Sequence, residues 1–335
     1  MLPLPAVPRV AVFRALQLGD LLCAIPALRA LRGAWPAARI ELVSLPWAAD
    51  LRDRYPEIVD EVIPFPGWPG LPEREPDIAA IPSFVAEMQA RRFDLAIQAH
   101  GDGRITDEIV RAFRARQMVG FTSTANPRPD CLPYPNTGHE IERLLALASF
   151  AGAPSLGPGF TFPVTHSDRA NRDAAWPDRN APHRYAVVHA GSRAADRRWS
   201  ASGFAAVADR LADLGFPPVL TGAPAEVDLA GEVADRMTAP AVNLAGRTTL
   251  GGLAALLEGA ALIVTNDTGV SHVAAGLRVP SVVLFTGSDP ARWAPLDAQP
   301  HRPVIVAGRP DGLVIAEVIA QAQSLLLAGA VDAHA

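Results

Sequence analysis

Lysine is absent from the 335-residue sequence, so all 30 basic residues are arginine. This excludes chemistry that needs a lysine amine: Schiff-base catalysis, attachment of pyridoxal phosphate and the lysine of a P-loop. Cysteine is also scarce, because Cys23 and Cys131 are the only two, too few for a disulfide framework or a cysteine zinc site. We therefore expect a protein of the reducing cytoplasm.

An excess of positive charge and long hydrophobic runs are missing too. The net charge is −5, which argues against a nucleic-acid partner, since such a protein needs a cationic face to displace counterions. Arg9, Arg14 and Asp20 interrupt the start of the chain before an export-type apolar core develops, and Glu258 and Glu317 break the best apolar stretches further on. We expect a soluble chain and leave contact with a membrane surface open.

Apolar residues, by contrast, make up 49% of the chain and follow a regular pattern. Short apolar runs typical of buried parallel strands alternate with segments of helical periodicity, which predicts an α/β fold of two doubly wound domains. The strands are predicted at 9–14, 39–44, 58–64, 93–98, 117–121, 185–189, 218–221, 241–244, 261–266 and 281–285. The helices are predicted from 19 to 31, at 78–91, 106–116, 201–214, 225–236 and 250–258, from 269, and at 313–327.

The domain boundary is predicted in or beside 151–184, a stretch with five prolines and weak periodicity. We assign residues 1–165 to an N-terminal domain and 182–312 to a C-terminal domain. A closing helix is assigned to 313–330, with packing back on the N-terminal domain as one option.

One motif of the C-terminal domain, Asp267-Thr268-Gly269, spells the aspartic-protease triplet, but that chemistry needs two carboxylates and the triplet occurs once. At the junction of a strand and a helix, its free backbone N–H groups and the helix dipole would form an anion site. His272 would lie on the same helix face. The alternative is that Asp267 caps the helix and His272 only packs; spacing alone does not decide.

A second motif of this domain joins small residues to positive charge. Gly191 and Ser192 end a strand with a turn that backbone and ligand can approach closely, and three arginines, Arg197 and Arg198 among them, follow within the seven residues 193–199. Arginine is suited to bidentate contacts with phosphate. The alternative is a solvated loop with Trp199 packed beneath the next helix, but two such turns in one domain favour a phosphate site.

Asp20 follows Gly19 in the first strand-to-helix turn of the chain. A carboxylate there is most often a helix cap, and its catalytic alternative is a base that deprotonates a hydroxyl.

Other sequence signals in this domain are weak. The turn 101–106 superficially matches G-x-G-x-x-G, but Thr106 replaces the third glycine, so an ordinary turn is favoured over a dinucleotide site. His100 and His139 lack metal-ligand spacing, and G-x-S-x-G does not occur. We predict neither a metal site nor a hydrolase triad.

Together these motifs resemble glycosyltransferase family 9, the ADP-heptose:lipopolysaccharide heptosyltransferases and their relatives. Arg14, Gly19-Asp20 and residues 26–31 are similar to the family's opening R-x-x-x-x-G-D and P-A-L-R-A-L. Residues 189–199 are similar to its H-P-G-x-S…K-R-W-P, with Ala190 in place of proline and Arg197 in place of lysine. Its C-terminal signature resembles the stretches 243–250, 266–272 and 285–290.

The resemblance implies a GT-B fold of two facing Rossmann-like domains, with the nucleotide sugar on the C-terminal one and the acceptor on the N-terminal one. It also implies inverting transfer without an essential metal or other cofactor. The residues implied are Asp20 as general base; Gly191, Ser192, Arg197 or Arg198, Asp267, Thr268, Gly269 and His272 at the donor diphosphate; Glu226, Thr248, Thr249 and Leu250 at the nucleoside; and Gly19, His100 and Arg104 on the acceptor side.

Three functions follow from this pattern. The first is transfer of heptose from ADP-heptose to a hydroxyl of a glycan or lipopolysaccharide core. The second is a GT-B enzyme that uses another nucleotide sugar in natural-product or surface-glycan synthesis. The third is a nucleotide-sugar-binding relative without turnover, against which the presence of Asp20 speaks. The expected partners are a nucleotide-sugar donor and a glycan or lipid-linked acceptor. We expect a cytoplasmic location, leave peripheral attachment to the inner membrane open, and derive no oligomeric state.

Overall fold

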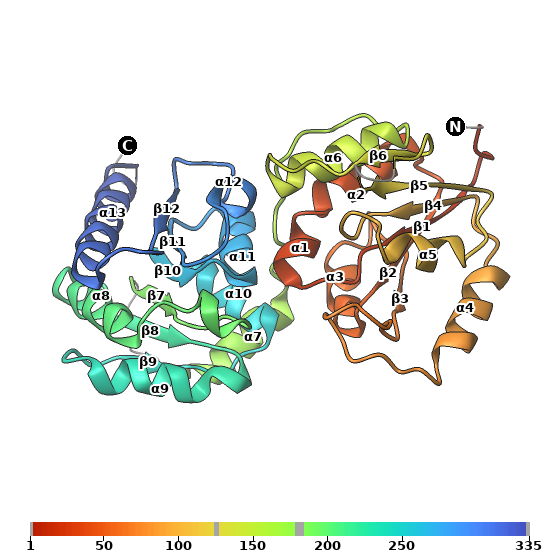
Figure 1. Ribbon diagram of the computed structural model, residues 1–335. Coiled ribbons are helices and arrows are strands. Elements are labelled where there is room, and N and C mark those ends of the chain that lie inside the picture. Colours follow the sequence, from red (N-terminus) through yellow and green to blue (C-terminus); the bar gives the residue numbers. More distant parts are fainter. Residues whose placement is uncertain (1–2, 124–126, 178–183, 333–335) are drawn as a thin grey trace. The chain divides into compact units, whose positions relative to one another are not determined.

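The computed structural model describes residues 3–123, 127–177 and 184–332. The chain forms two compact units, Met1–Phe160 and Thr161–Ala335, each built around one parallel six-stranded sheet (Figure 1). The division falls within the proline-rich stretch 151–184. That stretch is not simply a linker, because it contains the helix α7 (His166–Ala175), which Thr165 and Asp168 begin with a capping box.

The sheet of the first unit has the strand order β3-β2-β1-β4-β5-β6. Its strands are β1 (Arg9–Phe13), β2 (Arg39–Ser44), β3 (Glu61–Pro64), β4 (Leu95–Gln98), β5 (Gln117–Thr122) and β6 (Cys131–Pro133). Its helices are α1 (Leu18–Leu22), α2 (Ile25–Ala34), α3 (Ala49–Arg54), α4 (Ile81–Ala90), α5 (Thr106–Arg111) and α6 (Glu140–Phe150), with a 3-10 turn at Pro46–Ala48.

An aromatic cluster fills one side of this sheet. The Phe13 ring meets Phe65 edge-on at 5.0 Å, and Phe84 meets Phe113 edge-on at 5.9 Å, all four side chains being buried. Edge-to-face contacts of this kind add to the free energy gained by burying apolar area. They fix the end of β1, from which the chain enters the turn that carries Asp20.

The sheet of the second unit has the order β12-β11-β10-β7-β8-β9, which is the strand order of the first unit repeated. Its strands are β7 (Ala186–His189), β8 (Pro218–Thr221), β9 (Val242–Asn243), β10 (Leu262–Asn266), β11 (Ser281–Phe285) and β12 (His301–Ile305). Besides α7, its helices are α8 (Ala201–Asp213), α9 (Val227–Arg236), α10 (Leu250–Glu258), α11 (Gly269–Leu277), α12 (Pro290–Trp293) and α13 (Asp311–Asp332), with 3-10 turns at Ala195–Arg197 and Pro224–Glu226.

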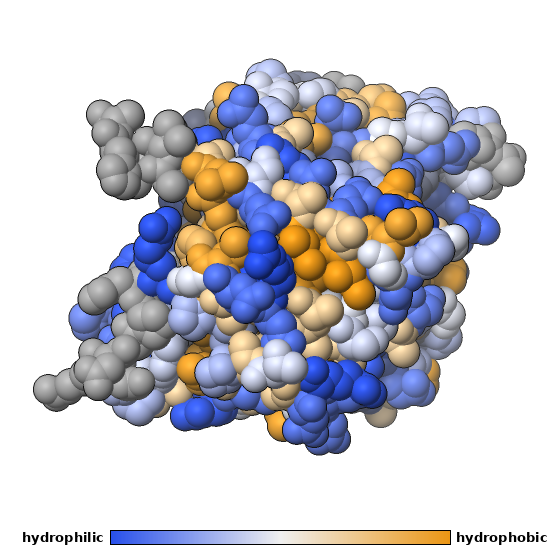
Figure 2. Space-filling view, turned by 90° about the vertical axis from the view of Figure 1, so that its left-hand side faces the viewer, coloured by the Kyte–Doolittle hydropathy of each residue, from blue (hydrophilic) through white to orange (hydrophobic). Residues whose placement is uncertain are grey.

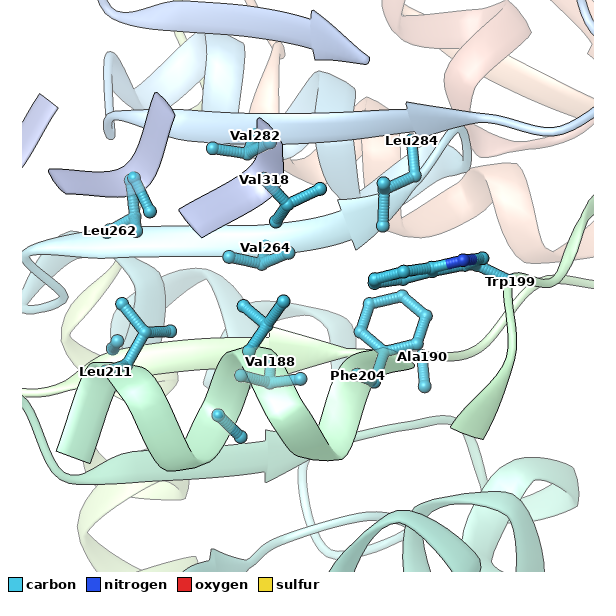
Figure 3. Packing of buried hydrophobic residues seen from close by; sticks show 14 of the residues in the cluster. Val188, Ala190, Trp199, Phe204, Leu211, Leu262, Val264, Val282, Leu284 and Val318 are labelled. Atoms are coloured by element: carbon cyan, nitrogen blue, oxygen red, sulfur yellow. The ribbon is translucent and has the colours of Figure 1, made fainter. Parts of the chain in front are cut away.

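Aliphatic side chains pack between this sheet and the helices α8 and α13. Val188 and Val264 from adjacent strands face Leu211 of α8 and Val318 of α13, with the Trp199 ring closing one end of the layer (Figure 3). Near-continuous apolar strands covered by helices are typical of parallel sheets, as the sequence pattern predicted.

Over Asp311–Ala328 the last helix is long and apolar enough to cross a membrane, judged by length and composition alone, although Glu317 led us to expect no such stretch. Its buried positions, Val314, Val318, Ala322 and Leu325, recur at helical spacing and belong to the core of the second unit. On the side of the unit where α13 lies, Figure 2 shows apolar residues interrupted by hydrophilic ones. The four buried positions account for the face of α13 that packs on its own sheet, whereas Leu313 and Leu327 are exposed.

The two strands that the sequence pattern missed, β6 and β12, are both edge strands that contain a proline, Pro133 and Pro303. Proline lacks the N–H that a central strand needs, so it is tolerated at sheet edges and hides such strands from a pattern search. The helix predicted from Gly19 to Leu31 is two helices, because α2 begins anew with Pro26 in its first turn.

Candidate active site

The predicted motifs lie at equivalent places in the two sheets. In the first sheet the strand order reverses between β1 and β4, and in the second between β7 and β10. Ligands of doubly wound folds bind at the carboxyl ends of the strands beside such a reversal. Asp20 and His100 follow β1 and β4, whereas Ser192 and Asp267 follow β7 and β10. Each unit thus presents its candidate residues where the fold favours a ligand.

Asp20 lies in the first turn of α1 and is not the N-cap, which is Gln17. Its carboxylate accepts a hydrogen bond from the Gln17 backbone, and its side chain is 24% exposed. Burial raises the pKa of Asp20 above its ordinary value, and the negative charge of Glu140 adds to this, while Arg14, the Gln17 backbone and His100 oppose it. A carboxylate with a raised pKa and partial access is a better base than a solvated one.

His100 is buried at the start of the β4–α5 turn. Its ring stacks on Phe13 with the planes 17° apart, and its Nε2 lies 3.4 Å from Glu73 Oε1. His100 Nδ1 is buried and has no hydrogen-bond partner among the described residues. Arg104, by contrast, is 78% exposed and pairs with Asp102, so the structure does not build it into a site.

The second glycine of the G-x-G in this turn is required by the backbone conformation. Gly103 has φ +82°, and a Cβ there would lie 2.6 Å from the Phe121 carbonyl oxygen, which no other residue could accommodate without a shift of the backbone. The turn 101–106 is therefore an ordinary tight turn, as favoured from the sequence.

In the second unit, Gly191 brings two predicted subsites together. A Cβ on Gly191 would lie 2.2 Å from Glu226 Oε2, so the carboxylate packs directly against the turn after β7. Glu226 Oε2 also accepts a hydrogen bond from the Ala223 N–H at 2.7 Å and lies 3.8 Å from His189 Nε2. Glu226 is only 11% exposed, so its carboxylate is not a solvated surface group.

Asn266, the last residue of β10, ties the Ala190–Trp199 loop to the sheet. Its side-chain amide donates to the Ala190 carbonyl at 2.8 Å, and its Oδ1 accepts from the Trp199 N–H at 3.0 Å. Trp199 in turn donates from Nε1 to Asp311 at the start of α13. The loop is thus held at both ends by one buried side chain, and only the arginine-rich segment between them is exposed.

Arg197 and Arg198, the two arginines of that loop singled out from the sequence, differ in their surroundings. Arg198 is half-buried, and its Nε donates to the Ser192 carbonyl at 2.7 Å. Arg197 ends the 3-10 turn and is exposed, with no ion pair or side-chain hydrogen bond to a described residue. Arg197 is therefore the arginine that can reach a ligand without giving up an internal contact.

The helix α11 begins at the Asp267–Gly269 motif without a side-chain cap. Thr268 is the N-cap, and the buried Asp267 carboxylate accepts from Ser288 Oγ at 2.5 Å, so Asp267 does not act as the cap. The first N–H groups of α11 are accordingly available to an anion. His272 is buried and meets Trp293 edge-on at 6.4 Å, which is the packing role considered for it.

Three of the predicted nucleoside residues, Thr248, Thr249 and Leu250, lie at the start of α10. The Thr249 hydroxyl caps α10 at Gly252 and also donates to Asn171 Oδ1 of α7. Any contact with a nucleoside from this place would have to come from the backbone or from Thr248 and Leu250, which are half-buried.

No role was predicted from the sequence for the side chains that support these candidates: Arg14, Glu73, Glu140, Asn266 and Ser288. The signal that could have found Arg14 is a charged residue directly after an apolar strand, because a buried charge must be paired. The other four lie far along the chain from the residues they support. Across the described ranges, no three His, Cys, Asp or Glu side chains gather to hold a metal ion.

Comparison with known proteins gives a consistent result. A sequence model of glycosyltransferase family 9 (heptosyltransferase) matches residues 84–305. Lipopolysaccharide heptosyltransferase 3 of Escherichia coli is 26% identical over 300 residues, which are 83% of this chain and 83% of that protein.

Two solved structures share the fold. The family 9 glycosyltransferase from Veillonella parvula DSM 2008 has a TM-score of 0.80 at 23% identity and covers 97% of this chain and 99% of its own. The ADP-heptose lps heptosyltransferase II of E. coli has a TM-score of 0.76 at 23% identity, with 96% and 99% covered. These neighbours confirm the predicted GT-B class, and the chain belongs to glycosyltransferase family 9.

Proposed function

We propose that this glycosyltransferase moves a heptosyl group from ADP-heptose to a hydroxyl of a lipopolysaccharide core or related glycan, with inversion at the anomeric carbon. The observation that carries the proposal is Asp20: a partly accessible carboxylate of raised pKa at the strand-order reversal of the first unit. The family and the E. coli relatives, whose names specify lipopolysaccharide and ADP-heptose, support the choice of substrates.

The reaction is a single displacement. The Asp20 carboxylate takes the proton of the acceptor hydroxyl, and the oxygen forms a bond to the anomeric carbon as the bond from that carbon to the diphosphate oxygen breaks. Attack from the face opposite the leaving group inverts the anomeric configuration. A general base of this kind contributes about 10²- to 10⁴-fold to the rate.

The second unit would hold the donor and stabilise the charge that develops on the leaving diphosphate. The uncapped N–H groups of α11 and the exposed Arg197 guanidinium would supply positive charge to the diphosphate. Glu226, beside Gly191, is placed to accept a hydrogen bond from a ribose hydroxyl.

The proposal includes no essential metal or other cofactor, since backbone N–H groups and arginine take the role of neutralising the diphosphate. Undiminished turnover after incubation with EDTA is the expected result. Loss of turnover that returns when Mg²⁺ or Mn²⁺ is added would contradict this part of the proposal. We further propose a cytoplasmic location, where Cys23 and Cys131 would stay as the buried thiols seen here.

The test of the whole proposal is donor consumption by the purified protein. ADP-heptose is supplied with a truncated lipopolysaccharide core, ADP release is measured, and the anomeric configuration of the product is read by NMR. GDP, UDP and dTDP sugars are supplied in parallel. Turnover with one of these and not with ADP-heptose would favour the enzyme of another pathway, and binding without turnover of any donor would favour the non-catalytic relative.

The nucleotide preference can be ranked separately by thermal unfolding. A ligand at about 100 times its dissociation constant stabilises the folded state by roughly 2.7 kcal/mol, a shift of about two degrees or more for a chain of this size. We expect ADP to raise the melting temperature more than GDP, UDP or dTDP at matched concentration.

A further inference from the structure

Arg14 directly follows β1 and precedes the turn that carries Asp20. Its guanidinium is almost fully buried, with 1% of the side chain exposed. Its Nε donates to the Asp20 carbonyl at 2.9 Å, and its Nη1 donates to the Ala99 carbonyl at 2.6 Å. These two bonds tie α1 to the end of β4. A buried positive charge also needs a negative partner, because leaving it unpaired costs several kcal/mol.

Two carboxylates compete for that role. The Glu140 Oε1 lies 3.0 Å from Arg14 Nη2, whereas the Asp20 Oδ1 lies 3.8 Å from the same nitrogen. Glu140 comes from α6, more than a hundred residues along the chain, and is itself buried, with 4% of the residue exposed. Arg14 therefore bonds to Glu140, and the Asp20 carboxylate stays outside hydrogen-bond distance.

We propose that Glu140 is a positioning residue for the transfer reaction: it engages the Arg14 guanidinium at hydrogen-bond distance, so that Asp20 makes only a longer contact of 3.8 Å with Arg14 and stays able to take a proton. The physical reason is the short range of strong ion pairing. A guanidinium in bidentate contact with a carboxylate stabilises the ionised form and makes it a weak base, and the neighbouring Glu140 charge opposes that stabilisation.

Within the part of the chain that the structure describes, three charged or titratable groups act on Asp20. Arg14 reaches it from the end of β1, Glu140 from α6 and His100 from the turn after β4. Of these, Glu140 alone raises the pKa of Asp20 through its charge. Arg143, one turn further along α6, lies 3.5 Å from Glu140 Oε2 and also contacts the Thr137 carbonyl and the Tyr134 ring, so it has other partners if the Glu140 charge is removed.

The test is the pH dependence of kcat/KM for Glu140→Gln. The amide oxygen can still accept from Arg14, so the fold is expected to hold while the negative charge is lost. The acidic limb of the curve of kcat/KM against pH should move to lower pH. The plateau value of kcat/KM should fall by at most about 10-fold, because Asp20 becomes a weaker base. The dissociation constant for ADP should not change, since the donor belongs to the second unit. Coincident pH profiles for the variant and the wild type would overturn the inference.

Two further variants give the controls. Glu142→Gln removes an exposed charge from the same helix and should leave the acidic limb in place. Glu140→Asp retains the charge and should restore the wild-type limb even where its plateau is lower. Should Glu140→Gln not fold, the paired change Arg14→Met with Glu140→Leu replaces it. The limb should then move above the wild-type value, because the Arg14 charge outweighs that of Glu140 in its effect on Asp20, and an unmoved limb would overturn the inference.

This inference rests on the proposed role of Asp20 as base, and Asp20→Asn separates the two. If Asp20→Asn keeps its turnover, the proposed role of Asp20 as the base fails, and with it the mechanism given above. If Asp20→Asn is inactive while the Glu140→Gln profile coincides with that of the wild type, only the role of Glu140 fails.

Discussion

In the first unit, the turn after the opening strand carries the Asp20 carboxylate beside the buried guanidinium of Arg14, whereas in the second unit the turn after the corresponding strand, β7, carries Gly191 and Ser192. The strand order around the two turns is the same. In the proposed function, the same scaffold position would support two chemistries: proton transfer, which needs a side chain of adjusted pKa, and anion binding, which needs backbone N–H groups directed at the ligand.

The two turns are also held in place differently. Charged groups tie down the first, since Arg14 bonds to two backbone carbonyls and to Glu140. A neutral amide ties down the second, since Asn266 bonds to Ala190 and Trp199. A neutral clamp adds no charge beside a diphosphate, while a charged cluster can shift the pKa of a neighbouring carboxylate. Substitutions in the two units should therefore separate into effects on turnover and effects on donor binding.

The largest effect is expected from Asp20→Asn. Turnover should fall by about 10²- to 10⁴-fold, because the amide cannot take the acceptor proton, while ADP binding to the second unit stays within a few-fold of wild type. Steady-state kinetics and calorimetric titration with ADP measure the two. Turnover within a few-fold of wild type in the folded variant would remove Asp20 from the mechanism.

The counterpart in the second unit is Asn266→Ala. The Ala190 carbonyl and the Trp199 N–H lose their buried partner, at about 1–3 kcal/mol each. We expect a lower melting temperature and ADP binding weakened by about 10-fold or more, with adenosine binding weakened less.

Thr265→Val is the matched control for Asn266→Ala. Thr265 is equally buried on β10, but its hydroxyl bonds only to the Asn266 carbonyl and does not reach the Ala190–Trp199 loop. The control should lose stability without changing the ratio of ADP to adenosine affinity. An equal change of that ratio in both variants would mean that Asn266 acts through general stability.

A smaller effect is expected from Arg197→Ala. Loss of a charge-assisted contact of about 1.5–3 kcal/mol should weaken ADP by roughly 10- to 100-fold and leave adenosine unchanged. Arg198→Ala should instead lower the melting temperature, because it removes the bond to the Ser192 carbonyl. If Arg198→Ala gives the loss that is selective for ADP and Arg197→Ala does not, the two arginines exchange roles.

The smallest effect is on stability, and it concerns Asp20 again. Burial raises the pKa of Asp20 in the folded chain above its value in the unfolded chain. The stability that Asp20 contributes is therefore fully present below the pKa of the unfolded chain and is lost as the pH rises through the pKa of the folded chain. At pH 7 the ionised carboxylate therefore costs stability, and Asp20→Asn should melt slightly above the wild type. The difference should vanish below about pH 4, where the unfolded chain is protonated too. A lower melting temperature for the variant at pH 7 would show that Asp20 stabilises α1 instead.

Much of the fold could be predicted because parallel strands buried on both faces leave a strong local signal. The predictions for β2 and α10 match the structure residue for residue. The wrong predictions have equally local causes. Pro133 and Pro303 made two edge strands unrecognisable from the pattern, and Pro26 begins a second helix where the periodicity predicted one continuous helix. The helix α6 was missed as well, although it supplies Glu140.

The candidate site was predicted to the extent that function depends on short motifs. Asp20, Gly191, Asp267 and their neighbours could be recognised because a turn after a strand and its small or acidic residues are contiguous in sequence. Whether Asp20 and Asp267 cap their helices could be decided only from the structure. The N-caps are Gln17 and Thr268 instead.

By itself, the sequence determined the two α/β repeats, the family and the turns that carry the candidate residues, since each is signalled by residues that lie close together in the chain. Only the tertiary structure decided which charges are near Asp20 and which side chain holds the Ala190–Trp199 loop. The pairs involved, Arg14 with Glu140 and Asn266 with Ala190, are 126 and 76 residues apart. Residues so far apart in the chain meet only because sheets and helices pack against one another. No local sequence pattern indicates which of them will be buried together and paired.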